Sequence, residues 1–285
     1  MSALGERMAA GASTFARAWV LTRRDGTVMG FTDHDGDLLV EGVTCRAASG
    51  MGAGAVEAGT GLAVDNGAVS GALAHDALTA ADIRAGRWDR AEVVAYLVDW
   101  RDPGTFEATF RGTLGEITEA DGRFAAELRG LAEALNAVRG RVYHARCDAV
   151  LGDGRCGLDL ELAGRRLRGR VTSVGAGGRL IGVEGGADRA EHWFARGVVR
   201  FEDGAAAGLE AAVKLDRADD GGRALELWTA PGAVPAVGDA VVVTTGCDKV
   251  METCRDKFAN MVNFRGFPHI PGDDWLMAVP SAGRR

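Results

Sequence analysis

Several features that mark membrane and secreted proteins are missing from this 285-residue sequence. No apolar run approaches the roughly 18–20 residues that a helix needs to cross a bilayer, so we expect no membrane-spanning segment. The N-terminal stretch contains Glu6 and Arg7 and lacks an apolar core, which is not the pattern of a secretory signal. We therefore expect folding in a reducing cytosol, where paired cysteines more often indicate metal binding than a disulfide.

The sequence also lacks an excess of positive charge and the usual catalytic motifs. Its formal net charge is -7 and its pI is about 5.3, which argues against a broad basic surface that wraps nucleic acid. It contains no GxSxG, HExxH, Walker A or dinucleotide-binding fingerprint. We therefore expect a protein that is not an enzyme.

Tyrosine is scarce and glycine is abundant, with two tyrosines against 42 glycines, which indicates many turns and short elements. We find no short repeat and no coiled-coil heptad. We predict a mainly β fold with two β-rich modules of the barrel or sandwich type and a few short helices. The expected domains are an N-terminal one at residues 1–158 and a C-terminal one at 159–285, with the boundary near 157–163.

Local patterns predict the individual elements. Asp25-Gly26 joins strands at 18–22 and 28–32, and Glu41-Gly42 is a tight turn in a second hairpin at 38–43. Further strands are predicted at residues 91–100, 105–117, 123–128, 167–174, 180–183, 198–202, 211–215, 225–228 and 240–245. Helices are predicted at residues 3–14, 79–86 with Thr79 as N-cap, 131–140 and 249–262, and a loop at 49–61.

Four of the five cysteines form two compact pairs, Cys147 with Cys156 and Cys247 with Cys254. The spacings are C-x8-C and C-x6-C, wider than the CxxC of zinc ribbons. Thiolates are soft ligands that suit zinc or iron–sulfur clusters, and two loops can present four of them around one centre. Spacing alone leaves three interpretations open: a metal or cluster site, buried structural cysteines, and a chance pairing.

Glycines lie beside these cysteines. Gly246 precedes Cys247, and Gly154 and Gly157 flank Cys156, where they would let the backbone approach a bulky centre and point N–H groups at its sulfurs. The fifth cysteine, Cys45, stands apart in a predicted strand and is expected to be a small core residue.

Two other patterns were weighed as sites. The run FTDHDGD at 31–37 alternates acids like a calcium loop, but its glycine stands fourth rather than sixth and Thr44 replaces the final Glu, so we predict a turn whose Asp side chains accept backbone N–H bonds. A Cys–His nucleophile is the enzymatic alternative, since His144 precedes Cys147 and His269 follows Cys254. That alternative requires a base within hydrogen-bond reach and an oxyanion hole.

The C-terminal run GCDKVMETCRDKFANMVNFRGFPHIPGDDW closely resembles the signature of the phage BR0599 family. The run WFARGVV at 193–199 resembles the start of that module, and FTDHDGDL at 31–38 resembles its N-terminal companion, a domain of unknown function seen in alphaproteobacterial phages, prophages and gene transfer agents. The resemblance covers nearly the whole chain. It implies a tail-tip or baseplate hub protein at the distal end of a virion tail, assembled in the bacterial cytoplasm.

Hub proteins of this kind are similar to the tail-tip protein L of phage lambda, whose C-terminal part holds an iron–sulfur cluster. The resemblance implies that Cys147, Cys156, Cys247 and Cys254 bind a structural [4Fe–4S] cluster. It also implies a homotrimer that contacts the distal tail or tail-tube protein and a tail-tip fibre or central tip protein, while DNA passes through its channel without specific binding. The alternatives are a zinc-stabilised adaptor, an adaptor with free thiols, and a tail-associated cell-wall hydrolase that uses a Cys–His pair.

Overall fold

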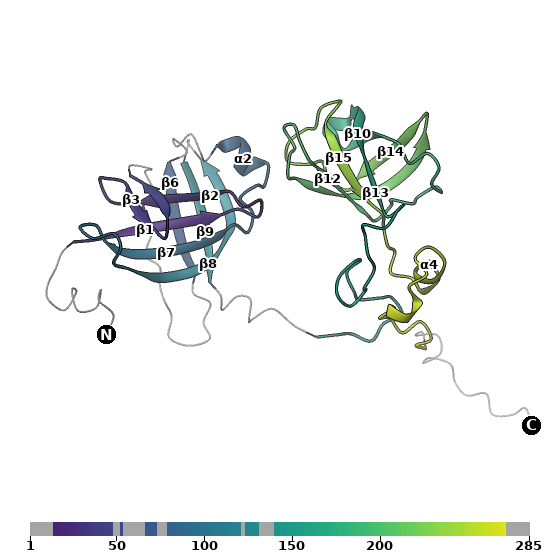
Figure 1. Cartoon of the computed structure of the whole chain (residues 1–285), viewed down its shortest axis with the longest axis horizontal. Coiled ribbons are helices and arrows are strands. Elements are labelled where there is room, and N and C mark those ends of the chain that lie inside the picture. Colours follow the sequence, from purple (N-terminus) through teal and green to yellow (C-terminus); the bar gives the residue numbers. More distant parts are fainter. Residues whose placement is uncertain are drawn as a thin grey trace, which may run out of the picture. The chain divides into compact units, whose positions relative to one another are not determined.

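The computed structural model describes residues 14–47, 52–53, 66–72, 79–120, 123–130 and 140–271. The chain forms two compact units, Met1–Val138 and Arg139–Arg285 (Figure 1). Both are built mainly of strands, which confirms the predicted fold class. The expected domain boundary at 158/159 stays a prediction. The predicted helices at 3–14 and 131–140 and the loop at 49–61 lie outside the described residues, except for their last positions and for Gly52–Ala53.

The described strands of the first unit form one sheet in the order β3-β4-β2-β1-β7-β8-β9-β6-β5. Neighbouring strands are antiparallel, except that β2 and β4 run parallel. The strands are β1 (Phe15–Thr22), β2 (Val28–Thr32), β3 (Leu38–Val40), β4 (Val43–Arg46), β5 (Gly52–Ala53), β6 (Asn66–Ala72), β7 (Glu92–Asp99), β8 (Phe106–Ala120) and β9 (Arg123–Gly130).

The predicted turns of this unit are present. Glu41 and Gly42 both have positive φ, 49° and 79°, the conformation that a two-residue hairpin loop requires. Thr79 caps α2 (Ala80–Arg84), because its hydroxyl accepts a hydrogen bond from the Asp82 N–H at 3.1 Å. The Asp-rich run forms the expected turn, in which Asp33 accepts the Arg17 N–H and Asp37 accepts the Ala47 N–H.

Strand β1 is covered on both faces. Trp19 and Leu21 pack into one apolar cluster, whereas Ala18 and Val20 pack into the other. Alternate side chains of a strand point to opposite faces, so a strand between two clusters has few exposed positions. Cys45 belongs to the second cluster and is fully buried, as predicted.

The described strands of the second unit close into a barrel in the order β10-β11-β14-β13-β12-β15 (Figure 1). All six predicted strands are present, as β10 (Arg166–Gly175), β11 (Leu180–Glu184), β12 (Val198–Phe201), β13 (Glu210–Asp219), β14 (Gly222–Leu227) and β15 (Ala240–Thr244). Val183, Phe201, Val213 and Val243 lie in its core and are fully buried. The closed order leaves this sheet without a free edge.

The prediction of one helix over 249–262 is wrong. The segment contains a short helix α4 (Met251–Asp256) and a 3-10 turn η2 (Met261–Asn263), with Ala259 between them at φ 49°. A left-handed residue ends an α-helix, and here it turns the chain so that Asn260 faces Cys156. Among the described residues, no helix has the length and apolar character needed to cross a membrane.

A cysteine-lined candidate metal centre

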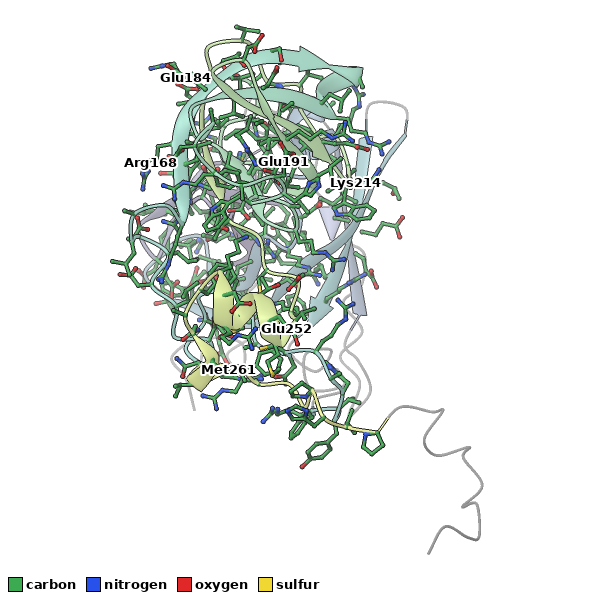
Figure 2. All side chains as sticks on the ribbon, turned by 90° about the vertical axis from the view of Figure 1, so that its right-hand side faces the viewer. Arg168, Glu184, Glu191, Lys214, Glu252 and Met261 are labelled. Atoms are coloured by element: carbon green, nitrogen blue, oxygen red, sulfur yellow. The ribbon has the colours of Figure 1, made fainter. Side chains whose placement is uncertain are left out.

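The structure brings the four paired cysteines together around one small cavity of the second unit. Cys147 and Cys156 come from the irregular segment before β10, Cys247 follows β15, and Cys254 lies on α4. All four are half-buried and none forms a disulfide. Figure 2 shows α4 and η2, marked by Glu252 and Met261, below the barrel. Both cysteine pairs therefore contribute to a single site.

Backbone hydrogen bonds hold the two cysteine segments side by side. The Cys147 N–H donates to the Lys249 carbonyl at 2.9 Å, and the Lys249 ammonium donates to the Ala149 carbonyl at 2.5 Å. Farther along, the Phe267 N–H donates to the His144 carbonyl at 2.9 Å. These contacts join residues about a hundred positions apart, so the site depends on long-range pairing that no local pattern specifies.

Nitrogen donors approach two of the four sulfur atoms. The Arg265 backbone N–H donates to the Cys147 sulfur at 3.4 Å, and the Asn260 side-chain amide lies 3.6 Å from the Cys156 sulfur and 2.7 Å from its carbonyl oxygen. Asn263 fixes that amide by donating to the Asn260 side-chain oxygen at 2.8 Å. Hydrogen bonds to sulfur are a usual way in which proteins stabilise metal-bound thiolates.

The position of Cys156 is set by a tight turn around Asp153. The Asp153 carboxylate accepts the N–H groups of Cys156 at 2.6 Å, Arg155 at 3.0 Å and Val150 at 3.0 Å. These backbone donors, the Cys156 N–H first, lower the pKa of Asp153. Neither Asp153 nor Asn260 was identified from the sequence as part of the site, although Gly154, the neighbour of Asp153, was.

Burial disfavours the charged form of two of the four thiols. It raises the pKa of Cys247, and it raises that of Cys254 to about 11, with the charges of the other three cysteines adding to the effect. Burial also lowers the pKa of Lys257 to about 8. Four thiolates in this cavity would therefore require a compensating positive centre, which a metal ion or iron–sulfur cluster supplies.

The donor set and its surroundings suit a bound metal centre, either an ion or a cluster. In the described part of the chain, no three His, Cys, Asp or Glu side chains converge closely enough to hold a single metal ion. In a [4Fe–4S] cluster, each thiolate binds its own iron, so the four sulfur atoms need not converge on one point. Ala149, Leu158 and Phe258 are buried and give the cavity an apolar wall.

The histidines proposed as catalytic bases are not engaged with the cysteines. His144 and His269 are both exposed, and within the described residues no hydrogen bond joins either ring to a sulfur atom. The Cys147 sulfur is instead approached by a backbone N–H group. The geometry therefore gives the Cys–His hypothesis no support.

The barrel is tied to this site through Trp193 and Lys257. The Lys257 ammonium donates to the Trp193 carbonyl at 2.6 Å and to the Gly246 carbonyl at 2.7 Å, and it lies 4.6 Å from the Trp193 ring. A Cβ atom at Gly246 would lie 1.6 Å from the Ala195 carbonyl oxygen, so only glycine can stand before Cys247 in this backbone path. The cysteine site is thereby fixed to one end of the barrel.

Comparison with known proteins places this architecture among structural proteins of phage-like particles. The family model described as "Baseplate hub protein, N-terminal attachment domain" matches residues 1–159, and that of "Phage conserved hypothetical protein BR0599" matches residues 192–274. A chain in a solved structure titled "Virion of native gene transfer agent (GTA) particle" is 47% identical, with a TM-score of 0.91, covering 100% of this chain and 98% of that one. No curated protein matches.

The chain belongs to the baseplate hub protein family. The resemblance drawn from the terminal cysteine run and from the early Asp-rich run is thereby confirmed.

Proposed function

We propose that this chain is a structural hub at the distal tip of the tail of a phage or gene transfer agent. The support is its membership of the hub family and its full-length similarity to a chain of a gene transfer agent virion. A mainly β construction suits the task, because sheets and barrels hold a rigid shape. In this proposal the protein acts by assembly and not as an enzyme.

The four cysteines hold a structural [4Fe–4S] cluster in this proposal. One observation carries it: four cysteines from distant segments line one cavity, and N–H groups approach the sulfur atoms of two of them; the four are Cys147, Cys156, Cys247 and Cys254. When bound, the cluster cross-links the terminal segment to residues 147–156, and its binding energy adds to the stability of the fold. The chain's own residues orient the thiols and shield them from water.

Assembly as a homotrimer would let the hub join the tail-tube protein to a tail fibre or central tip protein around a channel for DNA. The described strands of the barrel close on one another, whereas the described strands of the first unit form an open sheet that ends at β3 and β5. Cyclic assembly of identical chains is the usual way to build a ring. The negative net charge suits a lumen that does not retain its DNA.

Metal analysis of protein purified without oxygen tests the cluster. We expect a brown sample with broad visible absorption, about four irons and about four sulfides per chain. Substitution of any one of the four cysteines, such as Cys254→Ser, should remove most of the colour and iron. The matched control is Cys45→Ser, which should keep both. Colourless protein that contains one zinc per chain would show that the site binds zinc and not a cluster. Metal-free protein with titratable thiols would overturn the proposal that the site binds metal.

Electron microscopy of particles tests the proposed position of this chain at the tail tip. Particles produced without this chain should lack a completed tail tip, and an affinity label on this chain should mark the distal end of the tail and not the capsid. A label found elsewhere, or normal tips without the chain, would contradict the proposal.

A further inference from the structure

A second groove of the C-terminal unit lies on the outer face of strands β10, β15 and β12, next to Cys247. Strand pairing places its side chains in rows: Arg168 and Arg200 both pair with Val242, one from each side. Figure 2 shows Arg168 on the outside of the barrel. The groove therefore carries two arginines whose backbone positions lie about two strand spacings apart.

The charge of this groove is opposite to that of the chain. Its basic lining residues outnumber the acidic ones by five to two; they are Arg166, Arg168, Arg196, Arg200 and Lys249 against Glu202 and Glu210. The whole chain, by contrast, has a net charge of -7.

Several of these arginines are available to a partner. Arg166 and Arg168 share one carboxylate, that of Glu161, and Arg200 pairs with Glu202 at 3.0 Å. The side chains of Arg168 and Arg200 are 66% and 57% exposed, so these pairs are weak and exchangeable. Arginine binds carboxylates through two parallel hydrogen bonds, which makes an acidic partner the natural occupant.

The floor of the groove is apolar. Val150 and Val198 are 67% and 38% exposed, and Leu151, Leu160 and Val242 also line it. The phosphate backbone of a nucleic-acid duplex would leave these apolar side chains uncovered, and Glu202 and Glu210 would repel it. A protein segment that combines carboxylates with an apolar side chain matches both the rim and the floor.

The chain itself carries such a surface, because its charge is divided unevenly. Residues 1–138 contain 20 acidic and 12 basic side chains, a net charge of -8, whereas residues 139–285 contain 20 acidic and 21 basic, a net charge of +1. On the first unit, the turn at 33–37 leads into β3, which lies at one edge of the sheet among the described strands and whose Leu39 is 60% exposed. Asp35 in that turn is exposed as well.

We propose that the arginine-rimmed groove of one copy binds the acidic edge at residues 33–41 of a neighbouring copy, with Leu39 on the apolar floor. The inference rests on the proposed assembly of the hub and names the surfaces that close it. Such a contact is heterologous, because it joins one patch on a copy to a different patch on the neighbouring copy. Repetition of a heterologous contact closes a ring when the rotation between neighbouring copies is a whole fraction of a full turn. The opposite charges of the two patches favour contact between a groove and an edge, and the like charges of two grooves disfavour contact between them.

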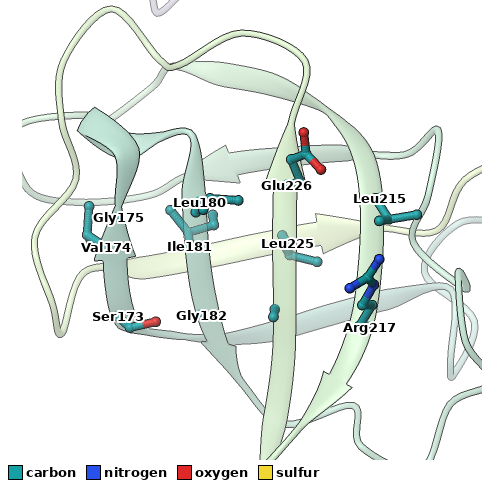
Figure 3. Close-up of a pocket in the computed structure, with 11 residues that line it drawn as sticks. Ser173, Val174, Gly175, Leu180, Ile181, Gly182, Leu215, Arg217, Leu225 and Glu226 are labelled. Carbon is teal, nitrogen blue, oxygen red and sulfur yellow. The ribbon is translucent and has the colours of Figure 1, made fainter.

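Another groove on the barrel does not offer this chemistry. It lies over β10, β11, β13 and β14, and Arg217 and Glu226 are its charged lining residues (Figure 3). Its two charged lining residues are of opposite sign, and Glu226 also accepts a hydrogen bond from Lys214 at 2.7 Å. It serves as the matched control surface.

The proposal is tested by substitutions in the full chain that reverse the charge of each surface. The molar mass of the assembly is measured by light scattering across a dilution series. The groove variant Arg168→Glu with Arg200→Glu and the edge variant Asp35→Arg with Leu39→Arg should each associate at least about tenfold more weakly than the natural chain. A chain that carries all four substitutions should associate again. The control variant Lys214→Glu with Arg217→Glu, which makes the same charge change on the other groove, should assemble normally.

Mixing the two variants identifies the contact as one between copies. The groove variant keeps an intact edge, the edge variant keeps an intact groove, and the two altered surfaces are again of opposite charge, so an equimolar mixture should associate although neither variant does so alone. Iron content should be unchanged in every variant. Assembly that persists in the groove variant overturns this inference and leaves the hub proposal standing, whereas a natural chain that stays monomeric overturns both the contact and the homotrimer. Duplex DNA binding that only the groove variant loses, with normal assembly, would assign the groove to nucleic acid instead.

Discussion

The barrel and the cysteine segments belong to one compact unit but are held together in different ways. The barrel has a closed hydrogen-bonded ladder around a core that includes Val183, Phe201 and Leu227, all fully buried. The cysteine segments contain only α4 and η2 as regular elements in the described residues, and they are held by single hydrogen bonds to carbonyls and sulfurs. A cluster would supply the cross-link that a small core cannot.

The largest expected effect separates these two regions. In Cys254→Ser, or after removal of metal by a chelator, residues 140–163 and 246–271 should lose most of their protection in amide hydrogen exchange, because their contacts converge on the cysteine site. The barrel strands should keep theirs, since none of their ladder bonds depends on the site. Equal loss of protection in both regions would show that the unit unfolds as one.

The second prediction concerns a substitution that destabilises the barrel and not the cysteine site. Asp216 and Arg223 form a hydrogen-bonded ion pair that is fully buried, and Asp216 also accepts the Phe194 N–H at 3.1 Å. Asp216→Ala leaves a buried guanidinium without its partner and should lower the free energy of unfolding by about 3–5 kcal/mol, as measured in denaturant. The control variant Asp188→Ala removes an exposed carboxylate and should change the free energy of unfolding by no more than about 0.5 kcal/mol. A similar loss in both variants would contradict this account.

The comparison also explains what could be predicted from the sequence. The hairpin turns at Asp25-Gly26 and Glu41-Gly42 and the strands of the barrel follow from local patterns, because turn chemistry and alternation act over a few residues. The helix at 249–262 was predicted too long, since the break at Ala259 is stabilised by Asn260 reaching Cys156 across the chain. Both cysteine pairs were visible, but the contact between their segments depends on bonds such as Cys147 to Lys249.

The third prediction concerns that long-range amide. Asn260→Ala removes the donor to the Cys156 sulfur and carbonyl, and if the site binds metal, its retention against a competing chelator should fall by about 10–100-fold. Asn260→Asp is the sharper variant, because it keeps the size but places a carboxylate beside a thiolate. Thermal unfolding of the barrel should change little in either variant. Unchanged retention in both would show that Asn260 supports the backbone alone.

The smallest expected effect concerns Cys45, which belongs to a core and not to the site. Burial raises the pKa of its thiol to about 11, and its side chain is fully buried against Leu38 and Val98. At pH 8 a disulfide reagent should therefore not reach the fully buried Cys45 of the native protein, whereas the four other thiols, which are only half-buried, should react once metal is removed. Denaturant should then release a fifth reacting thiol in a separate phase. The comparison between the two kinds of cysteine fails if Cys45 reacts together with the other four, because its protection would then depend on the site and not on the core of its own sheet.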